Sequence, residues 1–235
     1  MPNPNEADGR RRAPLTRARL LDTAVLRADA EGVEALSMRR LAHELGVVPM
    51  ALYKHVSNKD ELLDAMVDAV MAEVNDAVSR LDVRPQAWKP ALRRRILVAR
   101  GVFLRHPWAP ALIVARSATT PAVLRYFDSL IGLLRGSGFS VDLTHHALHA
   151  LGSRALGFTQ ELYNDSGDID AEATANIEAM AAQYPHITAM VADIVHDADT
   201  TLGWCDDQVE FEFSLDLMLN GLQTLRARSA RAPGH

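Results

Sequence analysis

The chain has 235 residues, of which 48% are apolar and 23% charged, enough for one large or two small globular domains with a buried core. No apolar run approaches the roughly 18 residues of a membrane-spanning helix, and residues 1–12 lack the apolar segment of a secretory signal. Cys205 is the only cysteine, which excludes an internal disulfide, so we expect a cytoplasmic protein.

The net charge of −5 hides an uneven distribution of charge along the chain. Residues 1–60 contain ten Lys and Arg against eight Asp and Glu, whereas residues 61–235 contain fifteen against twenty-two. A basic end on an acidic body is typical of a protein that presents one face to nucleic-acid phosphates, although an ordinary solvated surface can carry the same charges. The clustered basic residues are Arg10, Arg11, Arg12, Arg17, Arg19, Arg39, Arg40, Lys54 and Lys59.

Helices are the only regular elements that the sequence predicts, and the third of them is short. Thr16 and Ser37 are the expected N-caps of the first two, and Gly32 follows the first. Gly46 follows the second and can adopt the positive φ that a tight turn needs. The three helices are expected over Thr16–Ala30, Met38–Leu45 and Pro49–Val56.

A longer fourth helix is expected to begin at Asn58, which has capping-box spacing to Glu61, and to end near Leu81. The Asp82–Pro90 segment contains two prolines and marks the expected domain boundary. Later helices are expected over Trp88–Arg105, Ala109–Ser117, Pro121–Arg135, Ser140–Asn164, Asn176–Val195 and Gln208–Arg228.

The segment from Ser37 to Val56 has the order of a helix-turn-helix: a first helix, a tight turn and a second helix that fits the major groove. Leu52 and Val56 are expected to face the core. The Tyr and Lys side chains left outside can bond phosphates, the Met and Ala can contact thymine methyl groups, and the His can donate to phosphate or base. A small helical bundle with no role in DNA binding has the same spacing. The outward residues are Met50, Ala51, Tyr53, Lys54 and His55.

The order L-Y-x-H-x-x-N-K, from Leu52 to Lys59, is more specific than a generic helix-turn-helix. With it, the run from Gly32 to Met66 closely resembles the DNA-binding domain of the tetracycline-repressor (TetR) family. Many tetracycline repressors have Gln, Pro and Thr where this chain has Pro, Met and Ala, so the resemblance implies a different operator. By position, it implies DNA contacts by Arg39, Pro49, Met50, Ala51, Tyr53, Lys54, His55 and Lys59.

The resemblance continues more weakly over Trp88–Asp165, including the helix start at Pro121 and the Gly138–Phe139–Ser140 turn, and over the last helix. It implies an all-α homodimer. Residues 1–60 are then a basic arm and helix-turn-helix domain, and residues 61–235 a helical ligand-binding and dimerisation domain. In this family the eighth and last helices of two subunits form a four-helix bundle.

The expected function is that of a ligand-responsive transcriptional regulator, a repressor in its simplest form. Its homodimer binds a palindromic operator in double-stranded DNA, since two copies of one short helix read two half-sites. A small-molecule inducer binds more tightly to a dimer whose two helix-turn-helix domains are spaced wrongly for the operator. It releases the DNA to the extent of this preference. We expect no enzymatic activity, no cofactor and no metal.

The inducer pocket is expected beside the fifth to eighth helices, with an apolar lining and a few polar groups. The His with which tetracycline repressors help to hold drug-bound magnesium would fall close to Ile113, so a tetracycline–magnesium inducer is not expected. Candidate ligand contacts are Arg95, Phe103, Trp108, Leu112, Arg116, Phe127, Leu134, His149, Phe158, Glu161 and Met180.

Two alternatives are open at this stage, and the first is a metal, catalytic or redox site. His145 and His149 have the i, i+4 spacing of metal ligands on one helix face, with His146 between them, but no metal or catalytic motif accompanies them. Cys205 has no neighbouring cation that would activate it as a redox switch. The other alternative is a protein-interaction bundle without a specific operator.

Overall fold

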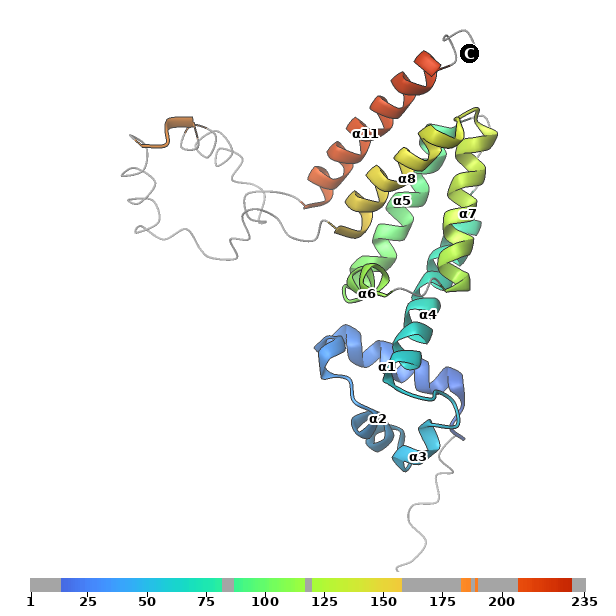
Figure 1. The fold of residues 1–235 in the computed structure, drawn as a ribbon. Helices are drawn as coiled ribbons and strands as arrows, with labels where there is room; N and C mark the ends of the chain where they lie inside the picture. Colours follow the sequence, from blue (N-terminus) through green and yellow to red (C-terminus); the bar gives the residue numbers. More distant parts are fainter. Residues whose placement is uncertain are drawn as a thin grey trace, which may run out of the picture. The chain divides into compact units, whose positions relative to one another are not determined.

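The computed structural model describes residues 14–81, 87–116, 120–157, 183–186, 189 and 207–229. All regular elements in these ranges are helical, which confirms the predicted fold class (Figure 1). None of the described helices is long and apolar enough to cross a membrane. Residues 1–157 with 225–235 form one compact unit and residues 158–224 a second. The expected division at residue 60 stays a prediction.

The first helices begin and end where local capping chemistry predicts. Helix α1 covers Arg17–Glu31, the short 3-10 helix η1 Val33–Ala35 and α2 Met38–Leu45. The side chains of Thr16 and Ser37 each accept a hydrogen bond from a backbone N–H in the first turn, as the sequence predicts. Apart from η1, which was not predicted, this part follows the sequence pattern closely.

Helix α3 is shorter than predicted, because it covers only Pro49–Leu52 instead of continuing to Val56. Pro49 occupies the first turn, where its missing N–H costs nothing. Beyond Leu52 the chain tightens: the N–H of His55 donates to the carbonyl of Leu52 at 2.8 Å, three residues back instead of four. The residues from Tyr53 to His55 therefore form a turn.

The remaining helices follow the predicted order with small differences at their ends. The eighth helix, expected to continue to Asn164, is described only to Gly157, and the segment expected over Asn176–Val195 lies almost entirely outside the described residues. The helices are α4 (Lys59–Ser79), α5 (Trp88–Arg105), α6 (Ala109–Ala115), α7 (Pro121–Gly136), α8 (Val141–Gly157) and α11 (Asp207–Ser229).

Helix α4 is the central element of the first unit, because it packs against α1, α5, α6 and α7 (Figure 1). Its buried side chains repeat at helical spacing and include Leu62, Met66, Val70 and Val74. Polar bonds fasten the start of α7 to it: the Asp68 carboxylate accepts from a backbone N–H of α7, and the Asn75 amide donates to a backbone carbonyl there, each at 2.9 Å. One continuous helix thus runs from the helix-turn-helix into the core that α5 to α7 build.

Candidate DNA-binding surface and pocket

The turn between α2 and α3 is a Schellman motif built on Gly46. Gly46 has φ 69° and ψ 35°, the left-handed conformation that glycine adopts without steric cost. Its N–H donates to the carbonyl of His43 at 3.1 Å, and the N–H of Val47 donates to that of Ala42 at 2.9 Å. The turn satisfies the last carbonyls of α2 and sets the direction in which α3 leaves.

Ion pairs hold α2 against α1. The Arg27 guanidinium on α1 pairs with Glu44 on α2 at 2.6 Å and with Glu31 on its own helix. Arg40 on α2 reaches Glu31 at 2.8 Å. Hydrogen bonds to Glu44 and Glu31 raise the pKa of Arg27, and the bond from Arg27 lowers the pKa of Glu31. These exposed pairs orient the two helices but add little stability.

The start of α4 confirms one half of the predicted capping box and corrects the other. Asn58 Oδ1 accepts from the N–H of Glu61 at 2.8 Å, as expected. The Glu61 carboxylate, however, accepts from the N–H and hydroxyl of Ser57, one residue before the cap. These bonds lower the pKa of Glu61. The chain between α3 and α4 is thus fixed by local bonds, which places Lys59 at the helix start.

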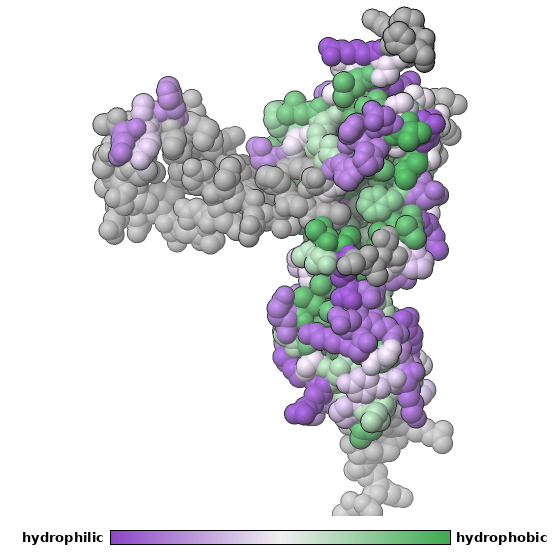
Figure 2. Space-filling model, viewed as in Figure 1, coloured by the Kyte–Doolittle hydropathy of each residue, from purple (hydrophilic) through white to green (hydrophobic). Residues whose placement is uncertain are grey.

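The residues predicted to contact DNA lie on one exposed end of the first unit. Leu52 and Val56 are buried, as expected, and anchor α3 and the turn after it. Met50 is 73% exposed, and Figure 2 shows a small hydrophobic area over α3 within a mainly hydrophilic surface. The exposed residues are Arg39, Pro49, Met50, Tyr53, Lys54 and Lys59, and the half-buried ones are Ala51 and His55. Their contacts with DNA stay predictions.

The cations on this surface differ in their partners. Arg27 and Arg40 are neutralised by glutamates. In contrast, none of the described residues forms an ion pair with Arg39, Lys54 or Lys59. Unpaired, exposed cations can meet phosphates without first breaking an internal bond, so the charge of these three side chains remains available to DNA.

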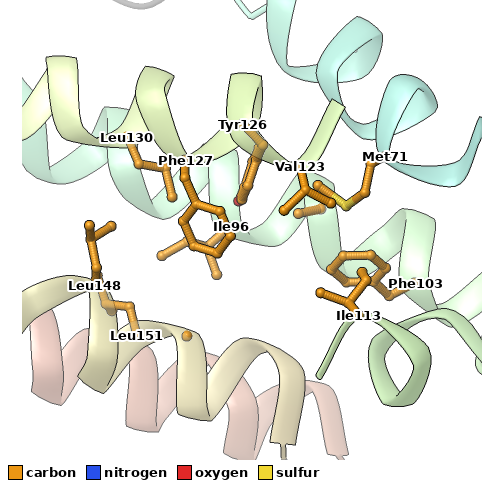
Figure 3. A pocket seen from close by; sticks show the side chains of 12 residues that line it. Met71, Ile96, Phe103, Ile113, Val123, Tyr126, Phe127, Leu130, Leu148 and Leu151 are labelled. Atoms are coloured by element: carbon orange, nitrogen blue, oxygen red, sulfur yellow. The ribbon is translucent and has the colours of Figure 1, made fainter. Parts of the chain in front are cut away.

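A pocket opens among α4 to α8, in the same unit (Figure 3). The empty space is about 520 Å³, counting the part that is open to solvent. Nearly every lining side chain is apolar, as is typical of small-molecule sites. The lining residues are Met71, Ile96, Ala99, Phe103, Ile113, Val123, Tyr126, Phe127, Leu130, Leu148, Leu151 and Gly152.

Two of the predicted ligand contacts, Phe103 and Phe127, line this pocket. Arg95 and Leu112 do not line it, although each directly precedes a lining residue in the sequence. Leu134 is fully buried elsewhere in the core. The predicted contacts Phe158, Glu161 and Met180 lie outside the described residues, as does Cys205.

Trp108 and Arg116, also predicted contacts, are committed to other partners instead of the pocket. The Trp108 Nε1–H donates to Asp29 of α1 at 2.7 Å. Arg116, just after α6, pairs with Asp64 of α4 and donates to the Asp60 carbonyl at 2.9 Å. The bond to Asp64 raises the pKa of Arg116. Both side chains therefore fasten α6 to helices of the DNA-binding end.

His106 adds to this connection. It is 9% exposed, and its Nδ1 lies 2.8 Å from Asp29 Oδ1 while its Nε2 lies 3.2 Å from Glu73 Oε2 on α4. Glu73 also pairs with Arg105, and that hydrogen bond, followed by the one from His106, lowers the pKa of Glu73. The loop between α5 and α6 is thus bonded to both α1 and α4.

The histidines of α8 lie away from the pocket lining. His145 and His149 are exposed, with ring centroids 4.5 Å apart, and His146 Nε2 is 3.5 Å from Asp142. In the part of the chain that the structure describes, no group of three or more His, Cys, Asp or Glu could hold a metal ion.

Most of the pocket lining could not be predicted from the sequence. Ile96, Ala99, Val123, Leu130 and Leu151 are ordinary apolar positions of amphipathic helices, and periodicity does not distinguish a side chain that packs from one that borders a space. The polar lining residue Tyr126 was the one detectable signal, because a tyrosine on an otherwise apolar helix face needs a partner for its hydroxyl.

A helix-turn-helix with unpaired cations, joined through α4 to an apolar pocket, defines a DNA-binding regulator with a small-molecule site. Residues 20–66 match the family described as bacterial regulatory proteins, tetR family, and residues 84–226 match the tetracyclin repressor-like C-terminal domain. The chain therefore belongs to the TetR family of transcriptional regulators, which confirms the resemblance.

Relatives and solved structures agree with this assignment. HTH-type transcriptional repressor DrrR1 of Streptomyces coeruleorubidus is 31% identical over 220 residues, 91% of this chain and 79% of that protein. Tetracycline repressor protein class C of Escherichia coli is 26% identical over 214 residues, 90% and 92% of the two chains. The crystal structure of ActR from Streptomyces coelicolor in complex with actinorhodin is 28% identical, with a TM-score of 0.69 over 91% of this chain and 99% of ActR.

Proposed function

We propose that this regulator is a repressor, that its homodimer binds a palindromic operator, and that a small molecule in the pocket between α4 and α8 releases it. One observation carries the proposal. Helix α6 borders the pocket through Ile113, and residues at both of its ends are bonded to α1 and α4, the helices that flank the helix-turn-helix. A ligand that displaces α6 must strain or break those bonds. It therefore favours a different position of α1 and α4.

The two ends of α6 act on different helices. At its start, Trp108 and His106 hold Asp29 near the end of α1. Just after its end, Arg116 holds Asp64 in the second turn of α4, close to Lys59. A small movement of α6 is thereby passed to both helices that flank α2 and α3. The proposal predicts that the effector changes the spacing of the two helix-turn-helix domains of the dimer without unfolding either domain.

Two features support the proposed dimer: the exposed apolar side chains of the last helix and the two-fold symmetry of a palindromic operator. On α11, Val209, Phe213 and Leu217 are each more than half exposed. An exposed apolar stripe on a helix favours burial against another chain. A two-fold dimer presents two identical reading heads, which matches a palindrome. Because the proposed partner is operator DNA, we place the protein in the cytoplasm and assign it a binding role without a catalytic step.

The test is a gel-shift titration of the full-length protein with DNA flanking its own gene, at several salt concentrations. A sequence-preferring complex whose affinity falls with salt supports the proposal. Lys54→Ala is expected to weaken binding and to lower the salt slope by about 1. Arg125→Ala, which removes an exposed cation of α7, serves as the matched control. Absence of sequence-preferring binding even at low salt would refute the proposal.

Release is tested separately. Compounds that raise the melting temperature of the protein are selected from a panel, then added to the operator complex. A compound that stabilises the protein and dissociates the complex is an inducer. If the stabilising compounds all leave the complex intact, the repressor–inducer part of the proposal is wrong while DNA binding stands.

A further inference from the structure

We infer that the pocket selects a ring-bearing, mostly apolar effector through one oxygen acceptor, a carbonyl or carboxylate, which the Tyr126 hydroxyl binds and the Arg95 charge favours. The inference rests on the proposed function, since it concerns the ligand chemistry of the same pocket. It assigns a polar end to a site whose lining is otherwise apolar.

Tyr126 is the one described lining residue with a polar side chain. It is 8% exposed, and Figure 3 shows it extending from α7 toward Ile96 on α5. Its backbone carbonyl accepts from Ser129 Oγ at 2.7 Å, whereas its hydroxyl has no hydrogen-bond partner among the described residues. The hydroxyl oxygen keeps some accessible surface, because it is not among the fully buried polar atoms that lack a partner. It can therefore donate to the oxygen of a ligand that enters the pocket.

Arg95 places a positive charge close to this hydroxyl. Its Nη1 donates to the Ser129 carbonyl at 2.7 Å, so the guanidinium is anchored one turn along α7 from Tyr126. Its Nε is buried and has no acceptor in the described part of the chain. Burial raises the pKa of Tyr126, and the charge of Arg95 partly opposes this effect. The phenol is therefore a neutral donor near neutral pH, in a locally positive environment.

This arrangement discriminates among ligands by charge and by acceptor. A carbonyl or carboxylate oxygen accepts from Tyr126 and gains from the nearby guanidinium. An ammonium group can do neither and is repelled. A ligand without any polar group leaves the hydroxyl unpaired, which a site built to bond an acceptor penalises. The aromatic rings of Phe103 and Phe127 favour a flat, ring-bearing body for the rest of the molecule.

Four probes with one shared body test the inference: acetylnaphthalene, naphthoate, ethylnaphthalene and naphthylmethylammonium. Their affinities for the full-length protein are measured by calorimetry in the absence of DNA. The ketone is expected to bind about 3- to 10-fold tighter than the ethyl compound, the value of one neutral hydrogen bond. The carboxylate is expected to bind at least as tightly as the ketone, and the ammonium compound most weakly.

Tyr126→Phe keeps the ring and removes only the hydroxyl. We expect it to bring the ketone to the affinity of ethylnaphthalene and to leave ethylnaphthalene within about 2-fold of its original affinity, since that probe makes no hydrogen bond. Phe127→Leu is the comparison, because it removes apolar contact and should weaken all four probes alike. Arg95→Gln is expected to abolish the preference for the carboxylate over the ammonium compound.

Three results would overturn the inference: no probe binds, the ketone binds no better than the ethyl compound, or Tyr126→Phe weakens all probes equally. Each can occur while operator binding and release remain intact, because the probe measurement contains no DNA. Conversely, failure to find an operator would refute the proposed function and leave the order of probe affinities as measured.

Discussion

Replacing Asp29 with alanine is expected to destabilise the protein where the pocket meets the DNA-binding end. The carboxylate accepts from Trp108 Nε1 at 2.7 Å and lies 2.8 Å from His106 Nδ1. Trp108 is 7% and His106 9% exposed, so water reaches the freed donors poorly. An unpaired buried donor costs about 1–3 kcal/mol. Because the Asp29 side chain itself is 23% exposed, we expect a total loss near the lower end, about 2–4 kcal/mol.

Thermal unfolding at a fixed protein concentration measures this loss. In a chain of this size, 1 kcal/mol corresponds to a shift of about 2–4 °C, so Asp29→Ala should lower the melting temperature by roughly 5–15 °C. The matched control is Asp22→Ala, an exposed aspartate on the same helix, which should stay within about 0.5 kcal/mol of the original protein. If both variants melt alike, the bonds to Asp29 do not carry the stability assigned to them.

Leu52→Ala is expected to cost about 2–5 kcal/mol in urea unfolding and to abolish operator binding, because a fully buried anchor of α3 is lost; a loss below about 1 kcal/mol would contradict this role. Gly46→Ala should destabilise by about 1 kcal/mol because its φ is 69°, whereas Gly132→Ala, inside α7 with open space around it, should stabilise slightly; equal effects would disprove the turn argument. Burial raises the pKa of Tyr126 above its ordinary value of 10.0, so the stability that comes from burying the neutral phenol is complete below that pH and is lost as the pH rises further. Tyr126→Phe should therefore reduce the loss of unfolding free energy at alkaline pH, and an unchanged pH dependence would count against this burial effect.

Features that depend on neighbours within about one helical turn could be predicted from the residue types alone. The bounds of Met38–Leu45 and Trp88–Arg105 were predicted as found, and so were the caps at Thr16 and Ser37 and the left-handed glycine at Gly46. Hydrogen bonds in helix caps and tight turns join residues three to five apart, so the residue types alone reveal them. The order of residues in the helix-turn-helix then identified the family.

The construction of the pocket and its connection to the helix-turn-helix depend on long-range packing, which the residue order does not reveal. Trp108 and Arg116 look like pocket residues in the sequence, yet their partners Asp29 and Asp64 lie 79 and 52 residues away along the chain. Conversely, Leu130 and Leu151 line the pocket although their helix faces read as ordinary core. Helical periodicity shows which face is apolar, but the packing of α4 to α8 decides which side chains on that face meet a neighbour and which border an empty space.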